Sequence, residues 1–165
     1  MNHGGAAELE QGGGEVAAGR AEGVRILGID YGSVTIGVAL SDELGVTAQA
    51  LPPVSRSKSG ADIERLAAIV RSEKVSRVVV GLPLNMNGSV GPKAREVMEF
   101  VEVLRGHLPV PVVTWDERLT TRAAEVALRE VGARRRQRKR LVDTVAAQLI
   151  LQSYLDSLEA EQSAT

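Results

Sequence analysis

The sequence predicts a single α/β domain, in which five strands form one mixed sheet with helices on both faces. Short runs of Val, Ile and Leu alternate along the chain with longer segments in which apolar residues recur at helical spacing. The 165 residues suffice for one domain with a sizeable core. Hydrophobic residues make up 44% of the chain and aromatic residues only 2%, so aliphatic side chains should fill this core.

Both ends of the chain are expected to lie outside the domain. Residues 1–23 are rich in Gly, Ala and Glu, which is typical of a disordered tail. They show neither the basic start nor the apolar stretch of a signal peptide. Residues 159–165 are expected to be frayed, which leaves residues 24–158 as the folded domain.

Three strands are predicted first, over residues 24–30, 35–42 and 46–54. The loop between the first two is short enough for a hairpin, so all three should form an antiparallel meander. Pro52 and Pro53 are expected to end the third strand, because proline has no N–H to donate to a sheet.

Helices and strands then alternate. Helices are predicted over residues 62–75, with Asp62 as a cap, and 91–108, with Pro92 in the first turn. Each leads into an apolar strand that should run parallel to the first strand, because it arrives through a helical crossover. These strands cover residues 76–84 and 110–120, and two last helices cover 120–132 and 142–158.

The composition excludes several kinds of chemistry. The chain has no cysteine, so it has no disulfide, no thiolate zinc site and no cysteine nucleophile, which fits a reducing cytoplasm. His3 and His107 are not placed to share a metal. No apolar stretch approaches the roughly 20 residues of a membrane span. The net charge of −1 gives no overall attraction to nucleic acid.

Acidic residues stand where predicted strands end. Asp30 ends the first strand, Asp116 and Glu117 lie near the end of the fifth, and Asp143 lies near the start of the last helix. Sites in α/β sheets form at the carboxyl ends of strands, so strands one and five are candidates to be close there. The last helix could bring Asp143 to the same point.

Three carboxylates in one place repel one another unless a cation joins them. Mg²⁺ prefers oxygen ligands and bridges carboxylates to phosphate, and two such ions can assist a phosphodiester displacement. Spacing does not choose between Asp116 and Glu117, because neighbours on a strand face opposite sides. One would be a ligand, and the other would face outward or hold Arg118.

Each acid also has a purely structural interpretation. Asp30 could be a turn residue, Glu117 and Arg118 a surface pair, and Asp143 a helix cap. The occurrence of all three at the expected chain positions favours the metal site.

Two further segments could contact phosphates. A basic run precedes Asp143, and phosphate neutralisation by such residues dominates nucleic-acid affinity, although a charge run is more often a solvated face. Its six cations are Arg134, Arg135, Arg136, Arg138, Lys139 and Arg140. Asn85 and Ser89 lie in a polar loop before a helix start, which suits either a phosphate-binding rim or an ordinary turn with a cap. Gly32 would let a phosphate approach the hairpin.

Four segments in order resemble the YqgF/RuvX family, whose members are described as pre-16S rRNA nucleases and as Holliday-junction-resolvase-like proteins. They are "LGIDYGSVTIGVALSD", "VVVGLPLNMNGSVGPKA", "VTWDERLTT" and "RKRLVDTVAAQLILQSYL". The resemblance covers residues 24–158.

This resemblance implies an RNase H-like fold and a cytoplasmic, metal-dependent nuclease that processes the 5′ end of pre-16S rRNA during ribosome biogenesis. It implies that Asp30, Glu117 and Asp143 are the catalytic set and hold one or two Mg²⁺ or Mn²⁺ ions. Thr35 departs from the family, which often has a basic residue there and sometimes also at Val34. A phosphate contact is therefore weakened or moved elsewhere.

Other functions stay open at this point. The same chemistry would serve a resolvase of DNA four-way junctions, which needs paired active sites, whereas we expect a monomer or weak dimer. A binding or transcription factor without activity is a further alternative. The hairpin around Asp30 also resembles that of sugar kinases and actin, but the chain is too short for their two halves.

Overall fold

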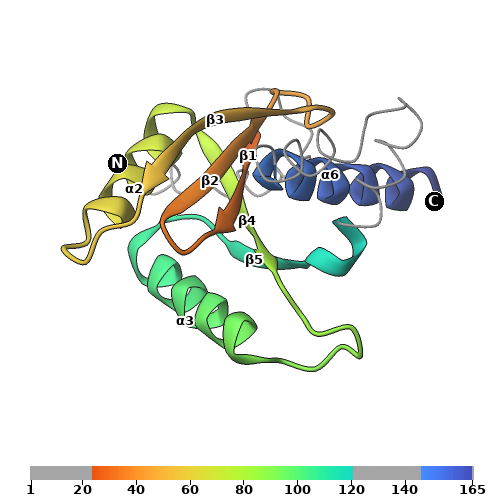
Figure 1. Cartoon of the computed structure of the whole chain (residues 1–165). Coiled ribbons are helices and arrows are strands. Elements are labelled where there is room, and N and C mark those ends of the chain that lie inside the picture. Colours follow the sequence, from red (N-terminus) through yellow and green to blue (C-terminus); the bar gives the residue numbers. More distant parts are fainter. Residues whose placement is uncertain (1–23, 121–145, 165) are drawn as a thin grey trace, which may run out of the picture.

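The computed structural model describes residues 24–120 and 146–164, and these residues form one sheet flanked by helices (Figure 1). The predicted helix at 120–132 lies, apart from its first residue, outside the described residues, as does the first turn of the last predicted helix. No helix in the two described ranges is long and apolar enough to cross a membrane.

The sheet has five strands in the order β3-β2-β1-β4-β5. Strands β1, β2 and β3 form the predicted antiparallel meander, and β4 and β5 run parallel to β1, so the mixed sheet is confirmed. Their bounds are Arg25–Tyr31, Thr35–Ser41, Ala48–Ser55, Val75–Leu82 and Val112–Asp116. Strands β1 and β5, which were candidates to be close at their carboxyl ends, are separated by β4 alone.

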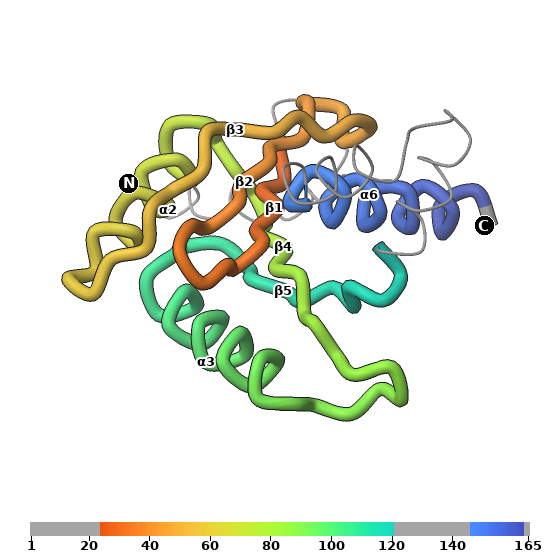
Figure 2. Tube along the Cα trace, viewed as in Figure 1, coloured from red at the N-terminus to blue at the C-terminus, as the bar shows by residue number. Residues whose placement is uncertain are grey.

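Helices cover both faces of the sheet, as predicted. Helices α2 (Ala61–Ser72) and α3 (Pro92–His107) pack on one face, and α6 (Ala146–Ala164) lies across the other. Figure 2 shows the chain crossing from β4 into α3 through a long loop, and from β3 into α2 through a short one.

Alternation along β1 separates the two sides of the core. Leu27 and Ile29 are fully buried in the larger cluster, together with side chains of α2 and α3. Ile26 and Gly28 face α6, because neighbouring residues on a strand point to opposite faces. Asp30 is the next alternate residue after Ile26 and Gly28, so it lies on the α6 face at the carboxyl end of β1.

Glycine residues let α6 approach the sheet closely. A Cβ built on Gly28 would lie 2.7 Å from the Cβ of Leu151 and 3.2 Å from the carbonyl oxygen of Ala147. A Cβ on Gly81 of β4 would lie 2.5 Å from Cδ1 of Ile150. A larger residue at Gly28 would therefore push α6 outward, whereas at Gly81 the flexible end of the Ile150 side chain would have to move.

Three expected boundaries are wrong. Pro52 and Pro53 lie inside β3 because this strand is at the sheet edge, where a missing N–H costs no inner hydrogen bond. Strand β5 ends at Asp116, and residues 117–120 are helical. Helix α6 continues past Leu158 to Ala164, because residues such as Ala160 and Glu161 favour helix even when exposed.

Asp62 does not cap α2. Gly60 is the N-cap residue and makes no side-chain cap bond. The Asp62 carboxylate is buried and accepts a hydrogen bond from the Ser57 N–H at 3.0 Å, which ties down the loop before the helix.

We predict that Gly28→Ala lowers the free energy of unfolding by about 1–3 kcal/mol, because the new methyl overpacks the contact with α6. Gly106→Ala is the matched control. Gly106 lies in α3 with nothing within 4 Å of its added Cβ, so the change should stabilise the protein by ~0.5–1 kcal/mol. Urea unfolding of both variants measures this, and equal effects of the two changes would contradict the close packing of α6.

Candidate active site

Asp30 lies at the carboxyl end of β1, beside the start of the described part of α6. It pairs with Gly37 of β2 across the antiparallel ladder. A Cβ on Gly37 would lie 3.4 Å from the Cβ of Asp30 and 3.4 Å from the Cβ of Ala147. The absence of a side chain at Gly37 therefore leaves room for the half-buried Asp30 carboxylate beneath the helix.

Glu117 reaches toward Asp30 by crossing over β4. Strands β1 and β5 are two strand spacings apart, roughly 10 Å, so only a long side chain can span part of that gap. A Cβ on Gly81 would lie 2.7 Å from Oε2 and 3.0 Å from Cγ of Glu117, which shows that this side chain lies over Gly81. Glu117 lies after the end of β5, so the alternation of side chains along a strand does not apply to it. This alternation was the reason why spacing could not choose between Asp116 and Glu117.

Burial and the charge of Asp30 both act on the carboxylate of Glu117. The pKa of Glu117 is raised from 4.5 to about 7, first by burial and then by the negative charge of Asp30. The charge of Asp116 adds to the rise, and Lys93 opposes it. Without a cation at the pair, the folded protein thus favours the protonated form of Glu117 more strongly than water does.

Lys93 is a site residue that the sequence reasoning missed. It is exposed in the first turn of α3, and its charge acts on Glu117. A lysine is unfavourable at a helix N-terminus, where the backbone dipole is positive, and no acidic residue stands in this first turn. That unfavourable placement was the available signal that Lys93 serves something other than the helix.

Asp116 is paired with Arg118. Nη2 of Arg118 donates to Oδ2 of Asp116 at 2.7 Å, and Nε donates to the carboxylate at 3.1 Å. These hydrogen bonds keep the pKa of Asp116 below its usual range. The structure thus gives the two neighbouring acids different partners: Asp116 pairs with Arg118, and Glu117 approaches Asp30.

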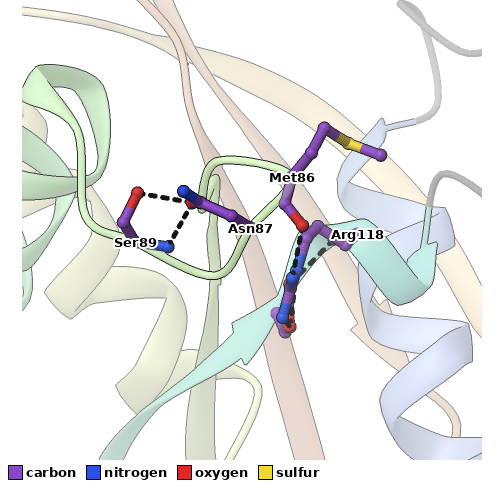
Figure 3. A network of polar contacts seen from close by, with 5 residues as sticks. Met86, Asn87, Ser89 and Arg118 are labelled. Carbon is purple, nitrogen blue, oxygen red and sulfur yellow. Dashed lines mark hydrogen bonds and ion pairs between the residues drawn. The ribbon is translucent and has the colours of Figure 1, made fainter.

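Arg118 connects the end of β5 to the loop between β4 and α3 (Figure 3). Its Nη1 donates to the carbonyl oxygen of Met86 at 3.0 Å. Within the loop, Asn85 donates to Oγ of Ser89 at 2.9 Å, and Asn87 accepts from the same hydroxyl at 2.6 Å. Asn85, Ser89 and Arg118, which were predicted to bind substrate, are thus joined in one braced structure at the rim of the site.

Gly32 closes the hairpin after β1. Its N–H donates to the carbonyl oxygen of Thr35 at 3.1 Å, and an added Cβ would lie 2.5 Å from that oxygen. Arg56, a second residue that the sequence reasoning missed, donates to the carbonyl of Gly32 at 3.2 Å and lies 4.4 Å over the ring of Tyr31. A cation therefore stands at this hairpin although Thr35 is neutral.

The remaining predicted site residues, Asp143 and the run from Arg134 to Arg140, lie outside the described residues. Within residues 24–120 and 146–164, no group of three or more His, Cys, Asp or Glu side chains could hold a metal ion. The described part of the site is therefore the pair Asp30 and Glu117, with Lys93 beside Glu117.

Paired carboxylates at the carboxyl end of a mixed sheet, with a lysine beside them, suit an enzyme that hydrolyses phosphodiester bonds. Residues 24–157 match the family model of RuvX, described as Holliday junction resolvase. The chain belongs to this family, and it is accordingly a nuclease. Family membership also carries the RNase H-like fold that the resemblance implied, with which the observed sheet agrees.

Curated relatives match over nearly their whole length. A protein of Bacillus licheniformis named "Putative pre-16S rRNA nuclease" is 48% identical over 139 residues, which are 83% of this chain and 100% of the relative. A protein of the same name from Clostridium kluyveri is 48% identical over 135 residues, 82% of this chain and 98% of the relative.

Solved structures show more distant similarity. RuvC of T. thermophilus in complex with a Holliday junction substrate has a TM-score of 0.49 and 16% identity, covering 79% of this chain and 91% of that one. Fowlpox virus resolvase with Holliday junction DNA has a TM-score of 0.42 and 11% identity, covering 81% and 98%. The family assignment rests on the sequence matches.

We predict that Glu117→Gln stabilises the metal-free protein at pH 8. The folded state raises the pKa of Glu117 from 4.5 to about 7, so the stability of the wild type falls as pH rises through this interval. Above it, ionised Glu117 lowers the free energy of unfolding by about 2–3 kcal/mol, which the neutral amide avoids.

The measurement is urea unfolding of wild type and variant in EDTA, at pH 5 and pH 8. The advantage of the variant should be small at pH 5 and largest at pH 8. An advantage that does not grow with pH would contradict the raised pKa of Glu117.

Proposed function

We propose that this nuclease is a metal-dependent endonuclease that acts on pre-16S rRNA, in the cytoplasm, during maturation of the 5′ end. The observation that carries this proposal is the approach of Glu117 to Asp30 at the strand ends. The choice of RNA is supported by the names of relatives that match over 98–100% of their own length.

Asp143 is proposed as the third acid of the set. It stands four residues before Ala147, and Ala147 lies beside Asp30 on the described part of α6. The sequence predicts a helix over residues 142–158, in which residues one turn apart would lie on the same side. This chain position supports a role for Asp143 next to the pair formed by Asp30 and Glu117.

The donor set fits a hard divalent cation. Asp30 and Glu117 offer only oxygen ligands. Burial, and then the negative charge of Asp30, raise the pKa of Glu117, and a cation would relieve both effects. Asp30, Glu117 and Asp143 would hold one or two Mg²⁺ or Mn²⁺ ions, which would supply Lewis-acid activation of the phosphodiester and of water.

The chain's own residues would bind and orient the substrate. Lys93 offers a cation to a phosphate next to Glu117, and Gly81 leaves the space in which Glu117 reaches the site. Gly32, Asn85, Ser89 and Arg118 are proposed as the rim around the substrate. The run from Arg134 to Arg140 would add affinity without reading sequence, because its contacts would be to phosphates.

Resolution of DNA four-way junctions is the second candidate, and the description of the family model favours it. Such an enzyme cuts two strands and needs two active sites, so a stable dimer would support it. For the RNA substrate we expect a monomer or weak dimer.

We predict that the purified chain cuts an rRNA precursor with Mg²⁺ or Mn²⁺ and not in EDTA, and that Asp30→Asn and Glu117→Gln each lower the rate at least ~100-fold. Binding of the RNA should change far less, because neither acid attracts phosphate. Asp156→Asn, an exposed carboxylate on α6, is the control and should cut like wild type.

A DNA four-way junction is assayed beside the RNA. Cutting of the junction alone would show that the substrate is branched DNA and not RNA. Binding without cutting of either substrate would overturn the endonuclease proposal and favour a binding role. Equal activity of wild type and Asp30→Asn would remove Asp30 from the catalytic set.

We also predict that Gly81→Ala keeps the fold but slows cleavage at least ~10-fold. The new methyl would meet Oε2 of Glu117 at 2.7 Å and Cδ1 of Ile150 at 2.5 Å, both at the flexible ends of side chains. These ends can move, so the substitution should displace the side chain of Glu117 and leave the backbone in place. Single-turnover cleavage tests this, with circular dichroism as the check of folding. An unchanged rate in a folded variant would show that the path of Glu117 over Gly81 is not needed.

A further inference from the structure

The loop between β4 and α3 exposes a large apolar side chain. Met86 is 86% exposed, the highest value among the large hydrophobic residues in the described ranges. Figure 3 shows its side chain pointing away from the loop, while its carbonyl oxygen faces Arg118. Exposing a methionine brings no hydrophobic stabilisation to the folded chain, and it leaves this side chain accessible to a ligand.

The loop that carries Met86 is firmly braced. The N–H of Asn85 donates to the carbonyl of Ser89 at 2.9 Å, and the N–H of Gly88 donates to the carbonyl of Asn85 at 2.8 Å. Asn87 accepts from both the N–H and the hydroxyl of Ser89. Met86 thus projects from a tight, hydrogen-bonded turn, which reduces the entropy lost when it contacts a ligand.

This turn is tied directly to the active site. The carbonyl of Met86 accepts from Arg118, which is held by Asp116 and directly follows Glu117. The turn is therefore joined, through Arg118, to the segment that carries Glu117. Because the turn is linked to the active-site segment, the substrate is the partner that Met86 is best placed to contact.

The aromatic residues of the chain are already occupied. Tyr31 stacks on Phe100 with ring centroids 4.0 Å apart, and Trp115 packs edge-on against Tyr154 at 5.6 Å. These four are all the aromatic residues that the chain has, and all are buried or half-buried. Among the described residues, a contact to a base would therefore come from another apolar side chain. Methionine is suitable, because its polarizable sulfur contacts ring edges and faces, and proteins insert it between base steps.

We propose that Met86 is a substrate-positioning residue that packs against an unstacked nucleobase of the bound nucleic acid. Lys93 would bind a phosphate, and the acidic pair would hold the metal that activates it. Met86 would add a contact to a base. The contact would favour substrates with unpaired or distorted nucleotides near the cut, whether a bulged RNA or the branch point of a DNA junction. This inference rests on the proposed nuclease function.

The test uses the full chain with Glu117→Gln, so that binding is measured without cleavage. The probes are an rRNA-precursor hairpin and a DNA four-way junction, each with 2-aminopurine placed in turn at unpaired or branch-point nucleotides. Binding should raise the fluorescence at one of these positions as the base leaves its neighbours. Adding Met86→Ala should abolish this rise and weaken binding about 2- to 10-fold.

Two variants serve as controls. Met86→Leu keeps an apolar side chain of similar size and should retain the fluorescence rise. Met98→Ala removes another exposed methionine, 44% exposed on α3, and should behave like the parent. All three substitutions are at exposed positions, so folding should not change.

Each outcome has a defined meaning. A rise on RNA alone assigns the contact to RNA, and a rise on the junction alone assigns it to DNA. Equal affinity and equal fluorescence with and without Met86 would overturn the inference. Weaker binding with an unchanged rise would show that Met86 touches something other than the base, which also overturns it. If the parent binds neither probe, the nucleic-acid function itself fails, and the role of Met86 fails with it.

Discussion

Where α6 crosses the sheet, the two are in contact nearly backbone to backbone, and the site depends on that contact. Gly28 and Gly81 leave no side chain between the strands and the helix, and Gly37 leaves room beside Asp30. The helix therefore begins, in its described part, directly over the carboxyl end of β1. The same gap over Gly81 admits the side chain of Glu117, so one feature of packing positions both the helix and the second acid.

This close packing has an electrostatic consequence. Burial beneath the helix would ordinarily disfavour ionised carboxylates, and the proximity of Asp30 disfavours Glu117 further. The fold keeps this unfavourable pair while it satisfies the neighbouring acid, Asp116, with hydrogen bonds from Arg118. Two adjacent residues in one segment thus differ in role: one holds the rim of the site together, and the other stays available for a ligand.

Much of the fold could be predicted from the sequence because its signals are local. The buried centre of β1 and the apolar face of α3, with Phe100 and Leu104, follow from the run and the spacing of apolar residues. The position of Pro52 and Pro53 could not be predicted, because whether a strand tolerates proline depends on its place in the sheet. Likewise, no local signal shows that β4 lies between β1 and β5.

For the site, the sequence indicated the acids but not how they meet. Alternation along a strand left Asp116 and Glu117 equivalent, and only the end of β5 at Asp116 separates them. Lys93 and Arg56 were missed because each acts on a residue distant in sequence. The contact between Gly81 and Glu117, which follows the end of the next strand, is a tertiary relation that no local pattern shows. The residue types therefore predict the chemistry of this site. Its geometry arises from the order of the strands and from the close packing of α6 on the sheet.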